Sequence, residues 1–120
     1  MSSAEPLDSE VLDSLLDSTG GDTGFLAELI DTYLADSASL FETMDRALAG
    51  ELPDELRRAA HSLKSNSATF GAMTLADTCR QIEERGKAGT LDAGVSSLIE
   101  SARAEYDRVH SVLQATRAEL

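Results

Sequence analysis

A chain of 120 residues with 42% hydrophobic side chains is long enough to bury one core, and a second folded domain is not expected. Its formal net charge of −12 repels phosphate backbones and anionic lipids, which argues against a nucleic-acid or membrane partner. The apolar runs are far shorter than the roughly 20 residues of a membrane span, and the N-terminus lacks the basic and apolar regions of a secretory signal. We therefore expect one cytoplasmic domain over residues 1–120, with residues 1–6 as a disordered tail.

The core of this domain must be built mainly from aliphatic side chains. Aromatic residues make up only 4% of the chain and Trp is absent, so Leu, Ala, Val and Ile supply the packing, as suits helices. Cys79 is the only cysteine, which excludes an internal disulfide. We interpret it as a small buried side chain rather than a redox centre.

Two helices are predicted in the N-terminal half. Asp8 can cap a short helix that ends at Gly20 and carries Leu pairs one turn apart. Asp22 can cap a long helix that ends at Gly50. The apolar face of the long helix consists of Leu26, Leu29, Ile30, Tyr33, Phe41, Met44 and Leu48.

Three more helices are predicted in the C-terminal half. Pro53 suits the first turn of a helix that runs to about Phe70, before Gly71 turns the chain back. The next helix starts at about Ala72, and Gly86 and Gly89 are expected to interrupt it. The last starts near Leu91, with weak helix formers over residues 92–97 that we expect to fray. The inward-facing residues of these helices are Leu56, Ala59, Ala60, Leu63, Ser67 and Phe70, then Leu75, Cys79 and Ile82, then Val95, Leu98, Ile99, Ala102, Tyr106, Val109, Val112 and Leu113.

The pattern as a whole predicts an all-α fold. No segment shows the sustained alternation of a strand, and four substantial amphipathic helices follow one another through short connections. Each must bury its apolar face against neighbours that short loops place beside it. We therefore expect an antiparallel up-down-up-down four-helix bundle, with the additional short N-terminal helix packed across one end.

His61 is the most informative residue of the predicted third helix. At 100° per residue it lies about 140° from Leu56, away from the buried stripe. Lys64 and Arg57 share its side of the helix, and the segment 57–64 holds three cations and no acid. Such a patch can stabilise phosphate oxygens on a modified imidazole and meet an acidic partner.

Other chemistries find weaker support. The glycines of residues 20–24 lack the Lys and the preceding strand of a nucleotide-binding loop. Asp107 and His110 form a single Asp-led pair, whereas a di-metal bundle site uses two Glu-x-x-His pairs and two further Glu. Ser62 and Ser65 lie near His61, but the sequence shows no oxyanion-binding nest for hydrolysis.

The chain reads His61-Ser62-Leu63-Lys64-Ser65, followed by Ser67-Ala68, Gly71-Ala72, Leu75, Cys79 and Ile82-Glu83. These residues resemble the histidine-containing phosphotransfer (HPt) domains of two-component phosphorelays, whose pattern is His-x-Leu-Lys-Gly, small residues, Gly-Ala, Leu, Cys or similar, and an apolar-Glu pair. The run from Asp22 to Ile30 and the five-helix layout are also similar to that family, so the resemblance covers nearly the whole chain.

The resemblance implies a phosphoryl carrier rather than an enzyme. His61 Nε2 would accept a phosphoryl group from a phospho-aspartate on one receiver domain, such as that of a hybrid histidine kinase, and pass it to the receiver of a response regulator. Glu83 would hydrogen-bond the other ring nitrogen, and Lys64 would steady the phosphate oxygens. The receiver would supply Mg²⁺, so the chain itself, expected to be a monomer, would need no cofactor or metal.

The resemblance also suggests which residues meet the receiver. Ser65 departs from the usual Gly, and its hydroxymethyl group either donates a hydrogen bond to phosphate or slightly hinders docking. Arg57 and Arg58 would steer the receiver, unless they are only solvated helix charges. Ala68 would keep the surface open, and Gly71 would keep the turn tight. The candidate apolar docking residues, for which packing in the core is an equal alternative, are Leu12, Leu15, Leu16 and Phe25.

Two other functions stay open at this point. The first is an adaptor with the same bundle fold, which binds a receiver or another helical partner without being phosphorylated. The second is a small hydrolase or metal-dependent bundle enzyme.

Overall fold

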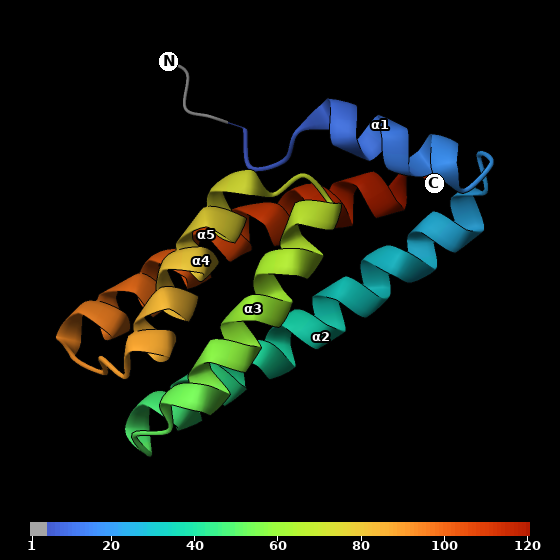
Figure 1. Ribbon diagram of the computed structural model, residues 1–120. Coiled ribbons are helices and arrows are strands. Elements are labelled where there is room, and N and C mark those ends of the chain that lie inside the picture. The colour runs from blue at the N-terminus through green and yellow to red at the C-terminus, as the bar shows by residue number, and fades with distance from the viewer. Residues whose placement is uncertain (1–4) are drawn as a thin grey trace.

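The computed structural model describes residues 5–120, so most of the predicted tail, residues 1–4, lies outside the described residues. The helices are α1 (Ser9–Ser18), α2 (Thr23–Ala49), α3 (Pro53–Thr69), α4 (Met73–Ala88) and α5 (Ala93–Ala118). Helices α2 to α5 form a four-helix bundle in which each packs on its neighbour in the chain and α2 also packs on α5. Helix α1 lies across the end of the bundle where α2 begins and α3 ends (Figure 1). The predicted all-α bundle with an extra N-terminal helix is confirmed.

Local sequence signals explain where α1, α2, α3 and α5 begin. Asp8 Oδ1 accepts a hydrogen bond from the Glu10 N–H, and Asp22 Oδ1 accepts one from the Phe25 N–H, both at 3.0 Å. Pro53 occupies the first turn of α3. Asp92 Oδ1 caps α5 by accepting from the backbone N–H of the residues at 94 and 95, so the prediction that residues 92–97 fray is wrong.

The predicted apolar faces form the core. Leu56, Leu63, Leu75 and Ile82 are fully buried between α3, α4 and the rest of the bundle, and α2 and α5 contribute their own faces. Val112 is an exception, because it remains 36% exposed. Successive helical residues point about 100° apart, and Leu113 rather than Val112 takes the inward position.

Gly86 does not interrupt α4 as predicted, because the helix continues to Ala88. A Cβ at Gly86 would lie 2.9 Å from the Pro53 carbonyl oxygen and 2.9 Å from the Arg57 backbone nitrogen. The glycine therefore serves tertiary packing by letting α3 and α4 approach closely. Gly89, with a φ of +72°, provides the actual end of the helix.

Candidate functional site

His61 lies on the outward side of α3, as its angle from the buried stripe predicted. Its side chain is 56% exposed, whereas its neighbours Ala60 and Leu63 are fully buried. Because buried neighbours fix the helix on both sides of it, the imidazole is held at a defined place on the surface. A ring presented in this way is accessible to a second molecule.

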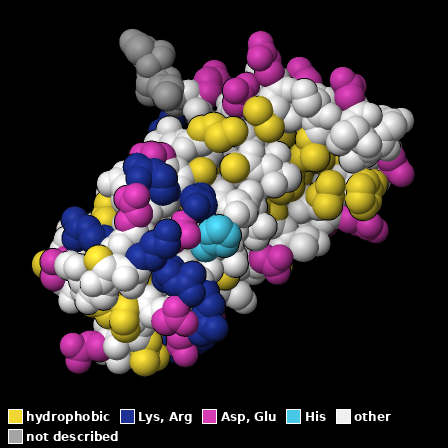
Figure 2. All heavy atoms as spheres, viewed as in Figure 1, with side chains coloured by type: hydrophobic (Ala, Val, Ile, Leu, Met, Phe, Trp, Pro, Cys, Tyr) yellow, Lys and Arg dark blue, Asp and Glu magenta, His cyan; other side chains and the backbone are white. Residues whose placement is uncertain are grey.

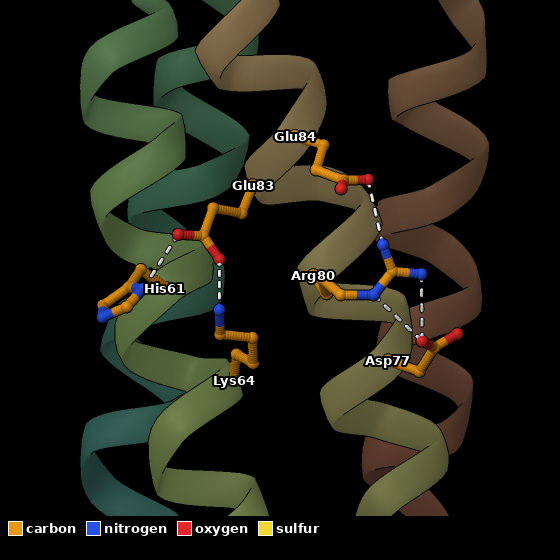
Figure 3. A network of polar contacts seen from close by, with 6 residues as sticks. All are labelled: His61, Lys64, Asp77, Arg80, Glu83 and Glu84. Carbon is orange, nitrogen blue, oxygen red and sulfur yellow. Dashed lines mark hydrogen bonds and ion pairs between the residues drawn. The ribbon is translucent and has the colours of Figure 1, made fainter.

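Glu83 joins His61 to Lys64 across the contact between α4 and α3. Its Oε2 lies 2.8 Å from His61 Nδ1, and its Oε1 accepts a hydrogen bond from Lys64 Nζ at 2.6 Å. Figure 3 shows the carboxylate reaching from α4 to both side chains of α3. The Glu83 side chain is only 10% exposed. One nearly buried carboxylate thus orients both side chains.

The charge of Glu83 decides which nitrogen of a neutral His61 ring carries the proton. Burial raises the pKa of Glu83, but the hydrogen bonds from Lys64 and His61 outweigh burial, so the pKa lies below its usual value. Glu83 is therefore a carboxylate at neutral pH and can only accept hydrogen bonds. In the neutral ring this places the proton on Nδ1 and leaves the Nε2 lone pair free, pointing away from Glu83.

The cations around His61 are paired with carboxylates. Lys64, expected to steady phosphate oxygens, is bound to Glu83 and is 30% exposed. Arg57 donates to Asp54 Oδ1 at 2.7 Å, and Arg58 lies 3.6 Å from Asp54 Oδ2. Asp54 precedes the acid-free segment 57–64 by one turn. Its carboxylate therefore partly offsets the positive charge of the two arginines, which that segment alone did not indicate.

Comparison with known proteins identifies the family. The Hpt domain model matches residues 28–119, more than three quarters of the chain. The chain belongs to the Hpt domain family. Proteins of this family are phosphocarriers of phosphorelays that interact with response-regulator receiver domains.

A solved structure supports the assignment of this Hpt domain. The structure is similar to that of histidine-containing phosphotransfer protein B from Pseudomonas aeruginosa PAO1, with a TM-score of 0.89 and 31% sequence identity. The similarity covers 98% of this chain and 99% of that chain. A comparison with curated protein sequences gives no match.

The expected docking residues of the Hpt domain lie in two places, on α3 beside His61 and on α1 with the start of α2. Ser65 and Ala68 follow His61 by one and two turns on the same side of α3, with Ser65 exposed and Ala68 half-buried. The α1 residues Leu12, Leu15 and Leu16 are partly buried against the core, whereas Phe25 is 48% exposed. Figure 2 shows apolar side chains over α1 and the start of α2.

Sequence reasoning missed two sets of contacts around the site. Asp54 pairs with both arginines, and its position one turn before them was the available signal. On α4, Arg80 is bound to Asp77 and Glu84, beside Glu83 (Figure 3). The spacing of these three α4 residues, three and four apart, predicts ion pairs on a helix surface.

Within residues 5–120, no three His, Cys, Asp or Glu side chains are grouped so as to hold a metal ion. No helix in that range combines the length and apolar character needed to cross a bilayer.

Proposed function

We propose that His61 is the residue that carries the phosphoryl group, taking it from a phospho-aspartate of one receiver domain and passing it to an aspartate of another. The observation that carries this proposal is the contact between His61 Nδ1 and the nearly buried Glu83 carboxylate, which turns Nε2 outward and, in the neutral ring, leaves its lone pair free. A nucleophile fixed in this orientation meets the positional demand of phosphoryl transfer.

The transfer step needs no reactant beyond the two proteins. The Nε2 lone pair attacks phosphorus, the N–P bond forms, and the P–O bond to the aspartate breaks as the carboxylate leaves with the electron pair. Nδ1 keeps its proton, so the phosphorylated ring gains positive charge, which the Glu83 carboxylate at 2.8 Å stabilises. Attack by a second receiver's aspartate on the same phosphorus reverses these bond changes and restores the neutral ring.

Other parts of the reaction fall to the receiver and to the rim of the site. The receiver supplies Mg²⁺ and the acidic pocket, so this chain acts as a carrier without a cofactor of its own. Lys64 lies one turn from His61 and supplies positive charge for the phosphoryl oxygens, and Ser65 faces the same side. Arg57 and Arg58 steer the receiver, while Ala68, α1 and Phe25 complete the docking surface. The carrier acts as a monomer in the cytoplasm.

The test is transfer of a labelled phosphoryl group from a phosphorylated receiver domain to this chain. The wild type should acquire an acid-labile, base-stable label, and His61→Gln should acquire none. His110→Gln is the control, because it removes the other histidine of the chain, whose ring lies tilted beside that of Tyr106 on α5. An unlabelled wild type that still binds the receiver would overturn the proposal in favour of an adaptor, and substrate turnover without a receiver would favour an enzyme.

A further inference from the structure

Helix α1 packs less deeply than the other helices of the described chain. None of its residues is buried, and its three leucines are only partly buried against the core. At its C-terminal end, residues 19–22 connect it directly to α2, where the Gly21 N–H donates to the Leu16 carbonyl. The position of α1 therefore depends on how its other end is held.

That other end is attached to the turn between α3 and α4. Leu7, just before α1, is 4% exposed and belongs to the hydrophobic core. The Asp8 N–H donates a hydrogen bond to the Gly71 carbonyl at 2.9 Å. We call Leu7, Asp8 and Gly71 the α1 anchor. Figure 1 shows the chain entering α1 beside this turn.

Gly71 is required in the α1 anchor for two separate reasons. Its φ of +81° is a left-handed conformation that L side chains rarely adopt. In addition, a Cβ at this position would lie 3.0 Å from the Asp8 carbonyl oxygen, 3.1 Å from the Asp8 nitrogen and 3.0 Å from Val11 Cβ. All three atoms belong to the start of α1 or the residue before it, and two are backbone atoms that cannot rotate away. A side chain at residue 71 would displace α1.

We infer that Gly71 and Leu7 are positioning residues for receiver binding, because they fix α1 relative to His61. This inference rests on the proposed function, in which the receiver docks on α1 as well as on α3. Gly71 lies two residues beyond the end of α3, the helix that carries His61, so the turn that holds the anchor is tied closely to His61. Loss of the anchor shifts the apolar part of the docking surface while the contact between His61 and Glu83 stays intact.

The chain offers a matched control for this inference. Gly89 has a similar φ of +72°, but among residues 5–120 nothing lies within 4 Å of the Cβ it would gain. Gly71→Ala and Gly89→Ala therefore impose similar backbone strain, and only the first contacts the start of α1. Leu7→Ala disturbs the α1 anchor from the other side without changing the turn.

The experiment compares the three variants in phosphoryl transfer from a phosphorylated receiver and in hydrogen exchange of the α1 amides. Gly71→Ala and Leu7→Ala should raise the receiver concentration that gives half-maximal transfer rate (the KM for the receiver) by roughly three- to ten-fold. The rate constant of transfer from a saturating receiver (kcat) should be unchanged. Their α1 amides should exchange roughly ten-fold faster while those of α3 do not. Gly89→Ala should match the wild type in KM and in α1 exchange.

Two results would overturn the inference. The first is a KM for Gly71→Ala equal to that of Gly89→Ala, together with a wild-type KM for Leu7→Ala. If Gly71→Ala does not fold, a wild-type KM for Leu7→Ala alone overturns the inference. The other is α1 exchange that none of the variants changes. A wild type that takes up no phosphoryl group would instead refute the proposed function, and the exchange data would still decide whether the anchor holds α1.

Discussion

At the scale of single residues, the site depends on how one carboxylate is shared. A nearly buried charge is tolerated only when it is paired, and Glu83 is paired twice, with Lys64 Nζ and His61 Nδ1. The bond to Nδ1 orients the imidazole and, in the neutral ring, places the proton on Nδ1 rather than on the outward nitrogen. In the proposed function, Glu83 therefore acts on the reaction through His61, as a positioning residue.

Replacement of Glu83 by Gln should slow phosphoryl transfer. The amide is neutral, so it stabilises the positive charge of the phosphorylated ring less well, and it has one acceptor oxygen for two donors. We expect the rate constant of transfer from a saturating receiver to fall about ten-fold, a loss typical of removing a group that orients a functional imidazole. Glu84→Gln is the control, because Glu84 is exposed and bound to Arg80. Equal rates in the two variants would contradict the role of Glu83.

The lowered pKa of Glu83 also predicts how stability depends on pH. The folded-state pKa lies below the usual 4.5, so the stabilising effect of Glu83 is fully present well above that pH. The effect is lost as the pH falls from about 4.5 through the lower folded-state pKa. Urea unfolding should show the stability difference between wild type and Glu83→Gln shrinking over this window. A difference that stays constant down to the lowest pH at which both fold would refute the prediction.

Part of this site was predictable from local spacing alone. The exposure of His61 followed from its angle on α3, and residue 83 was singled out through the family resemblance. The Lys64 contact with Glu83 joins residues 19 positions apart and depends on the packing of α3 on α4, which periodicity does not describe. Asp54 lies one turn before the acid-free segment 57–64, so that segment alone does not reveal its pairing with the arginines.

At the scale of helices, the close packing of α3 on α4 brings Glu83 within reach of His61. Gly86 lies at that contact, against the first turn of α3. In a helix interior, Ala is ordinarily more stable than Gly by about 0.5–1 kcal/mol. The close contact should reverse this preference.

Gly86→Ala should lower the free energy of unfolding by about 1 to 3 kcal/mol, because the added methyl group must push α3 away from α4. The control is Gly24→Ala in the first turn of α2, where the new Cβ would meet only Asp22 Oδ1 at an ordinary 3.4 Å. That variant should be neutral or slightly more stable in urea unfolding. A stabilised Gly86→Ala would show that the two helices are not in close contact.

The starts of α1, α2 and α3 were predictable because each is encoded locally, by an aspartate cap or by Pro53. Gly86 and Val112 were misjudged for the opposite reason. A glycine inside a helix looks like an interruption until the neighbouring helix is placed against it. On α5, Leu113 rather than its neighbour Val112 takes the inward position, which only the packing of the bundle decides, and Val112 stays partly exposed.

At the scale of the whole molecule, charge is distributed very unevenly. Residues 53–88, which contain α3 and α4, hold six of the ten basic and five of the 22 acidic side chains, so this part carries +1 and the rest −13. Figure 2 shows Lys and Arg side chains gathered over α3 and α4. An acidic partner is thus favoured on the His61 face and repelled elsewhere.

Arg58→Glu should slow association with the receiver several-fold at low ionic strength, measured by stopped flow. Arg58 is exposed and lies one turn from His61. The effect should disappear near 1 M salt, where the Debye length is about 3 Å. Arg108→Glu on α5 changes the net charge equally and should slow association less. Equal effects of the two changes would mean that only total charge matters.

The most direct test of the account is to identify the phosphorylated atom by ³¹P NMR after transfer from a receiver. Because Glu83 holds Nδ1 of His61, the account predicts one resonance of phosphohistidine linked through Nε2, absent from His61→Gln. A phosphoryl group on Nδ1, on a residue other than His61, or one retained by His61→Gln would contradict it.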